Sequence, residues 1–180
     1  MNNLIKLNKF FFKTFISIIL FLFLITQHNI CLSQSNTRVT VRGTGYPVPR
    51  FVSIKNDEAW LRKGPSTSHK IDWVYKISGL PLKIVAEFDD WRKVIDSSGS
   101  IGWMHRINLS SKRTAEITKT NTNLYESPNL NSKIIAYTED GAILNLIRCK
   151  NNWCRLKYKN LSGWVTKDKL YGVMENEKFE

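Results

Sequence analysis

Apolar and polar side chains alternate with a period of two along most of the chain beyond residue 50. The clearest stretch is 91–103, WRKVIDSSGSIGW, in which every second residue from Trp91 falls on one face and every second residue from Arg92 on the other. The alternation stops at a short polar turn and resumes at Gly-Trp. This pattern predicts a β-hairpin with one buried face.

The same construction returns at 153–164, WCRLKYKNLSGW. Trp153 repeats Trp91, and the Gly-Trp that ends at Trp164 repeats the one that ends at Trp103. The segment NLYESP at 123–128 corresponds in the same way to WLRKGP at 60–65. The shift between matched positions stays nearly constant, which indicates a duplicated unit with small insertions and deletions in its loops.

Each copy contains five or six short strand patterns and no pattern typical of an α-helix; residues 105–109 are long enough only for one 3₁₀ turn. The sequence therefore predicts an all-β fold of two tandem, small, open β-barrels. We place the first copy at 51–110 and the second at 111–173. The Gly- and Pro-containing segment 34–50 is predicted to be a linker, and the charged tail 174–180 is predicted to fray.

Residues 1–33 are predicted to be an N-terminal signal helix. Lys6, Lys9 and Lys13 precede an apolar run at 15–25, which is too short to cross a bilayer as a helix but suits a signal peptide. We place cleavage after Ser33, which predicts export to the periplasm or the extracellular space with no integral membrane span in the mature chain. An uncleaved membrane anchor remains the alternative.

The chain is strongly basic, with a net charge of +12 from 27 basic and 15 acidic residues. Removing the three lysines of the signal leaves 24 − 15 = +9. In an exported protein this charge indicates anionic envelope polymers or lipid head groups as partners, and not nucleic acid. The alternative is that the lysines only keep the protein soluble.

Cys149 and Cys154 are the two cysteines of the mature chain, and they flank the turn that leads into the second Trp hairpin. An even pair facing across adjacent strands in an oxidising compartment predicts a disulfide, which would stabilise the fold by about 2 kcal/mol. Their spacing is not the C-x-x-C of redox enzymes. At the equivalent positions the first copy has Glu87 and Arg92, which predicts a cross-strand ion pair.

The segment WLRKGPS at 60–66, then a lone Trp, then Gly-Trp with a Leu six residues later, resembles the bacterial SH3 domain family. The family pattern is a polar residue, an apolar residue and Arg-x-Gly-Pro. Trp60 replaces the usual Asn, and the second copy is more divergent because it has Tyr125 in place of Arg and Ser127 in place of Gly. The resemblance covers 51–173 and implies tandem SH3-like barrels, as in exported SH3-like proteins. It implies little about function, because one scaffold hosts many sites.

Groups that would support catalysis are missing from the sequence pattern. There is no G-x-S-x-G motif, and the aspartates lie at predicted turns. The histidines of the mature chain, His69 and His105, have no recognised metal-binding spacing with the cysteines. We therefore predict no enzymatic activity, no cofactor and no metal.

Aromatic residues are the remaining candidates for function, although most are expected in the cores, above all Trp103 and Trp164. Trp60 and Trp73 have no aromatic counterpart in the second copy, which favours a ligand groove over a core position. The residues expected to bind a ligand are those of this wall and the two cations beside it, which suit a carboxylate: Trp60, Arg62, Lys63, Trp73 and Tyr75.

These features predict an exported, non-catalytic binding module of the cell envelope that recognises a peptidoglycan peptide or an envelope protein through aromatic grooves. The alternative is a structural or regulatory subunit that docks onto a larger envelope partner, which an exposed apolar patch linking the copies would favour. A cell-wall hydrolase is the least favoured interpretation.

Overall fold

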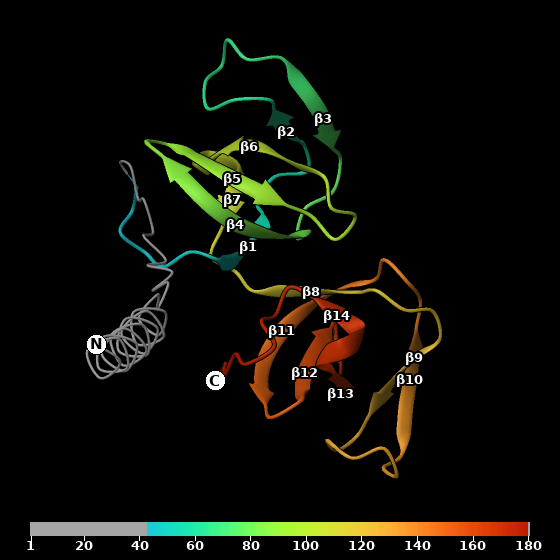
Figure 1. Cartoon of the computed structure of the whole chain (residues 1–180). Coiled ribbons are helices and arrows are strands. Elements are labelled where there is room, and N and C mark those ends of the chain that lie inside the picture. The colour runs from blue at the N-terminus through green and yellow to red at the C-terminus, as the bar shows by residue number, and fades with distance from the viewer. Residues whose placement is uncertain (1–42, 180) are drawn as a thin grey trace, which may run out of the picture. The chain divides into compact units, whose positions relative to one another are not determined.

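The computed structural model describes residues 43–179, so the predicted signal segment 1–33 lies outside the described residues. Strands form two separate seven-stranded sheets over this range, and the described residues contain no α-helix (Figure 1). The predicted all-β fold of two tandem SH3-like domains is confirmed. In the part of the chain that the structure describes, no helix is long and apolar enough to cross a membrane.

The first sheet has the strand order β3-β2-β6-β5-β4-β1-β7, and every strand pair in it is antiparallel. A single 3₁₀ turn, η2, follows β6, as the sequence predicts. Its elements are β1 Arg50–Ile54, β2 Ala59–Arg62, β3 Ile71–Tyr75, β4 Pro81–Phe88, β5 Trp91–Ile95, β6 Ile101–His105, η2 Arg106–Asn108 and β7 Leu109–Ser110.

The second sheet has the order β10-β9-β13-β12-β11-β8-β14, which is the order of the first sheet with every strand number raised by seven. The duplication inferred from the sequence is thus also a duplication of topology. Its elements are β8 Thr114–Ile117, β9 Thr122–Tyr125, β10 Ile134–Thr138, β11 Ile143–Lys150, β12 Trp153–Tyr158, β13 Leu161–Thr166, η3 Lys167–Lys169 and β14 Leu170–Tyr171.

Each sheet closes around its own apolar cluster, and the two clusters share no residue. Burying each large aliphatic side chain contributes about 1.5–3 kcal/mol. The fully buried members include Ile54, Leu61, Leu82, Ile84, Val94 and Met104 in the first copy and Ile117, Leu124, Leu156 and Val165 in the second.

Of the two Trp residues expected in the cores, Trp164 is buried as expected, at 5% exposure, whereas Trp103 is only half-buried, which differs from the expectation. Neither ring is a member of the two apolar clusters. The glycine explains the arrangement, because a Cβ at Gly102 would lie 2.6 Å from Cγ of Leu61. Glycine therefore takes the inward position, the Trp that follows points outward, and Met104 fills the core.

The two predicted cross-strand pairs at the hairpins are confirmed. Cys149 and Cys154 are opposite each other on β11 and β12 and form a disulfide with a Cα–Cα distance of 4.1 Å. Glu87 and Arg92 are opposite each other on β4 and β5, and Nε of Arg92 lies 3.1 Å from Oε1 of Glu87.

The described ends of the chain are docked onto the sheets. Thr44, in the predicted linker, donates its backbone N–H to Oε2 of Glu87 at 2.6 Å. The expectation that the tail frays is wrong for Met174–Phe179: the backbone N–H of Cys149 donates to O of Phe179 at 2.6 Å, and Glu177 pairs with Arg113. The tail pairs because the edge of β11 beyond Leu146 has no neighbouring strand there, so its backbone groups need a partner.

Candidate binding groove

The first copy has an aromatic groove of about 360 Å³, formed by β2 and its following loop on one side and by β5, β6 and η2 on the other. Its walls are Trp60 and Arg62 on the first side and Trp91, His105 and Ile107 on the second. We call this hollow the aromatic groove.

Hydrogen bonds hold the first wall in place. The Trp60 side chain is 45% exposed, and its indole Nε1 donates to Oε1 of Glu58 at 2.9 Å. The guanidinium carbon of Arg62 lies 5.6 Å from the centre of the Trp60 ring, within the range of a cation–π contact. Nη1 of Arg62 donates to the backbone oxygens of Thr67 at 3.1 Å and His69 at 2.8 Å, so the loop after β2 fixes the cation.

The second wall consists of two rings that pack edge to face. The centres of the Trp91 and His105 rings are 5.2 Å apart, with an angle of 82° between their planes. These residues are paired in register across β5 and β6, which places them on one face of the sheet. Ile107, in η2, adds an exposed aliphatic side chain. The groove thus offers two aromatic surfaces and one fixed cation.

Two of the five residues expected to bind a ligand, Trp60 and Arg62, line this groove together. Trp73 lies elsewhere, because it is paired with Leu61, whereas Trp60 is paired with Val74. Adjacent residues of a strand point to opposite faces, so the two Trp side chains lie on opposite faces of the β2–β3 hairpin. Trp73 is 60% exposed there.

The other two expected residues also lie outside the aromatic groove. Lys63 is exposed, and its Nζ lies 3.4 Å from Oδ1 of Asp72. Tyr75 is buried in the core, and its hydroxyl donates to Oδ2 of Asp96 at 2.8 Å. Burial and the Asp96 carboxylate raise the pKa of the Tyr75 phenol, so this hydroxyl stays protonated. These contacts describe Tyr75 as a buried structural residue.

Sequence reasoning missed the second wall of the groove. From the sequence, Trp91 is interpreted as one of several structural Trp residues, and His105 is considered only as a possible metal ligand. The hairpin pattern contained the necessary signal: counting outward from the turn at 96–100 places Trp91 opposite His105 at the open end of the hairpin.

The corresponding position in the second copy is closed by a side chain of the protein itself. Tyr125 is paired with Trp164 as Arg62 is paired with Trp103, so Tyr125 takes the place of Arg62. The centres of the Tyr125 and Trp153 rings are 5.5 Å apart at 88°, and Tyr125 is only 8% exposed. The ring occupies the space that is open beside Trp91 in the first copy.

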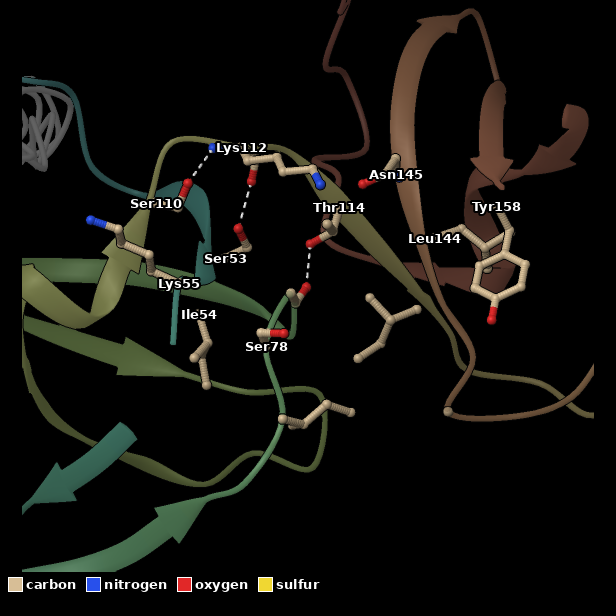
Figure 2. Close-up of a pocket in the computed structure, with 14 residues that line it drawn as sticks. Ser53, Ile54, Lys55, Ser78, Ser110, Lys112, Thr114, Leu144, Asn145 and Tyr158 are labelled. Atoms are coloured by element: carbon tan, nitrogen blue, oxygen red, sulfur yellow. Dashed lines mark hydrogen bonds between the residues drawn. The ribbon is translucent and has the colours of Figure 1, made fainter. Parts of the chain in front are cut away.

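A second hollow, of about 510 Å³, lies at the segment that joins the copies. Figure 2 shows its polar groups bonded to one another: Oγ of Ser53 donates to O of Lys112 at 2.7 Å, and Oγ1 of Thr114 donates to O of Gly79 at 2.6 Å. It also contains the exposed apolar side chains Ile77 and Tyr158. Among residues 43–179, no three His, Cys, Asp or Glu side chains are grouped so that they could hold a metal ion.

A comparison with models of protein families identifies the family of this fold. The model of the bacterial SH3 domain matches residues 55–111 and 118–172, which together cover more than half of the chain. The chain belongs to the bacterial SH3 domain family.

None of the curated proteins compared with the chain matches it. Solved structures with a similar arrangement are NlpC1 of Trichomonas vaginalis (13% identity, 73% of this chain and 48% of that one, TM-score 0.32) and NlpC2 of the same organism (14%, 74% and 51%, TM-score 0.33). A third is an NlpC/P60 family protein of Bacillus cereus (16%, 67% and 55%, TM-score 0.31). The chain spans about half the length of these structures.

Proposed function

We propose that the protein is an exported, non-catalytic binding module of the cell envelope, which binds the peptide part of peptidoglycan in the aromatic groove of its first copy. Membership in the family supports this proposal, because bacterial SH3 domains are cell-wall binding modules. The disulfide between Cys149 and Cys154 supports export, because such bonds persist in oxidising compartments.

The observation that carries the proposal is that the groove is open beside Trp91, where Tyr125 fills the equivalent space of the second copy. An extended peptide binds SH3-like grooves by laying its side chains against aromatic walls. Arg62 stands at the end of one wall, held by two backbone oxygens, and a guanidinium in a fixed position suits the carboxylates of an acidic peptide.

The composition of the groove supports a role in binding and not in catalysis. Neither Ser nor Cys is among the residues that line it, and the hydroxyl side chain there is that of Thr67. Glu58, the carboxylate of the groove, accepts a hydrogen bond from the Trp60 indole. Incubation of the protein with peptidoglycan should therefore release no soluble fragments.

Co-sedimentation of the full chain with purified peptidoglycan tests the proposal. We expect retention of the wild type and at least a tenfold weaker affinity for Trp60→Ala, which removes one wall. Trp73→Ala is the matched control, since it removes an equally large exposed ring that lies outside the groove, and it should bind like the wild type. No retention of the wild type, or equal losses in both variants, would refute the assignment.

The exposed apolar side chains at the joint favour a second candidate function, docking onto a larger envelope protein. In that case Ile77→Asp would abolish capture of the envelope partner, while Trp60→Ala would leave it unchanged. The opposite pattern would assign partner binding to the aromatic groove.

A further inference from the structure

The second copy has a basic groove of about 1060 Å³ on the outer face of its sheet, beside the disulfide. Its cations are Arg148, Lys150, Arg155 and Lys178, and Glu126 is its single acidic residue. The buried ring of Trp164 forms part of its floor. We call this hollow the basic groove; Tyr125, which is paired with Trp164, is not among its lining residues.

Strand register places two of the cations directly against each other. Arg148 on β11 is paired with Arg155 on β12, and Arg155 is paired with Trp164 on β13. Residues paired in this way have Cα atoms about 4.5–5.5 Å apart and share a face of the sheet. Like charges at such positions destabilise the sheet.

The protein does not neutralise this charge within the described residues. None of the four cations forms an ion pair with a described carboxylate; the ion pairs of the second copy are Arg113 with Glu177 and Lys119 with Asp168. Glu126 lines the groove without pairing with any of them. An anion from outside the chain would relieve the repulsion between Arg148 and Arg155.

Both guanidinium groups are held in place before any ligand binds. The Arg148 guanidinium carbon lies 5.1 Å from the centre of the Trp164 ring, and Trp164 is only 5% exposed beneath it. A guanidinium stacked on a ring keeps its in-plane N–H groups free to donate. Nη2 of Arg155 donates to Oγ of Ser162 at 3.0 Å, which leaves its remaining donors for a ligand. The adjacent disulfide joins β11 and β12 at the next residue pair.

The first copy shows that the fold does not require these charges. When the two copies are aligned on Trp91 and Trp153, the positions of Arg148, Lys150 and Arg155 correspond to Ala86, Phe88 and Lys93. The same strand pair forms there with Ala86 opposite Lys93, and so with one cation in place of three. The basic row is therefore an addition to the second copy and not a part of the barrel.

We propose that the basic groove binds an extended polymer that carries repeated phosphate groups. A tetrahedral phosphate directs its oxygens away from one plane, so one group can accept hydrogen bonds from arginines on two adjacent strands, and the next group can reach Lys150. A planar carboxylate is less suited to bridging two strands. The cations line a hollow between the loop after β9 and the tail, which suits a linear chain better than a flat lipid surface.

Binding of the full chain to inorganic polyphosphate tests this site without peptidoglycan. We expect Arg148→Gln/Arg155→Gln to weaken binding about ten- to a hundredfold, and we expect the affinity of the wild type to fall steeply with salt. The control is Lys76→Gln/Lys93→Gln, which removes the same net charge from the first copy and should have little effect. Trp60→Ala should bind polyphosphate like the wild type, which separates this site from the aromatic groove.

Thermal unfolding shows whether a loss of binding in the variant comes from a loss of folded structure. Because Arg148→Gln/Arg155→Gln removes a like-charge contact, its Tm in the absence of ligand should equal or exceed that of the wild type. Equal losses in the two double variants would show binding by net charge alone and overturn the proposal. It would also be overturned by tighter binding to polyglutamate, which would assign carboxylate chemistry, or to vesicles of anionic phospholipid, which would assign a membrane surface.

Discussion

Glu87 lies opposite Arg92 on neighbouring strands, at the two positions that the disulfide occupies in the second copy. Glu87 also accepts hydrogen bonds from Arg50 and from Thr44 of the preceding segment. Burial alone would raise the pKa of the Glu87 carboxyl, but the hydrogen bonds from Arg50 and Thr44 outweigh it and hold that pKa below its usual value. One copy thus fastens this hairpin with a covalent bond and the other with a buried ionic cluster.

Replacing Glu87 with Gln should lower the free energy of unfolding by about 3 kcal/mol at neutral pH, since it leaves Arg50 and Arg92 without their carboxylate. The folded state favours the ionised form, so this stabilisation is complete above the unfolded pKa of about 4.3 and is lost as the pH falls through the lower folded pKa. Urea unfolding at several pH values should show the difference shrinking in acid. A difference independent of pH would contradict this account.

Removing the disulfide should destabilise the second copy by about 2 kcal/mol, because the closed loop is short. In Cys149→Ser/Cys154→Ser, amide hydrogen exchange in β11 and β12 should accelerate. The matched strands β4 and β5 of the first copy serve as the internal reference and should keep their protection. Acceleration in both copies to the same extent would show that the two do not unfold separately.

Glu116 should have the opposite effect on stability to Glu87. Burial raises the pKa of its carboxyl, and the nearby carboxylates of Asp96 and Asp140 raise it further. The ionised form is thus disfavoured in the folded state, so Glu116 lowers stability above its folded pKa and has no such effect once both states are protonated. Glu116→Gln should raise the Tm at neutral pH and leave it unchanged in acid; a lower Tm at neutral pH would be inconsistent with this assignment.

Filling the aromatic groove should abolish ligand binding without unfolding the barrel. Trp60→Asn/Arg62→Tyr gives the first copy the residues that Asn123 and Tyr125 supply in the second, where the Tyr ring packs against a Trp. We expect retention on peptidoglycan to fall at least tenfold, with a free energy of unfolding within about 1 kcal/mol of the wild type. Unimpaired retention by this folded variant would exclude the groove as the binding site.

Deleting residues 174–180 should destabilise the second copy by about 1–3 kcal/mol, because the deletion leaves the backbone N–H of Cys149 without its acceptor at Phe179 and Arg113 without Glu177. Thermal unfolding of the truncated chain measures the loss. Glu177→Gln isolates the ionic part, and an unchanged Tm in the deletion would mean that the tail contributes nothing.

The fold could be predicted from the sequence because two independent patterns agree. Period-two alternation fixes which residues face inward, and the constant shift of about sixty residues shows the unit twice. The cross-strand pairs of Glu87 with Arg92 and of Cys149 with Cys154 follow from the same alternation, because a tight turn fixes the register of a hairpin.

The groove could be predicted only in part, because its walls come from segments that the sequence does not place together. Trp60 and Trp73 are separated by a loop, and the irregular register between Leu61 and Arg62 determines on which face each Trp ends. Alternation alone gives no such information across a long loop. The hydrogen bond from the backbone N–H of Cys149 to Phe179 could not be predicted either. The composition of a charged tail does not show that the edge of β11 has a backbone N–H that needs an acceptor.

The separate apolar clusters of the two barrels allow each half of the chain to specialise on its own. An outward-facing substitution in one half, such as Arg for Tyr beside a Trp, leaves the interior of the other half untouched. Gene duplication can then yield a division of labour within a single polypeptide, in which one module keeps an aromatic surface while its twin accumulates positive charge.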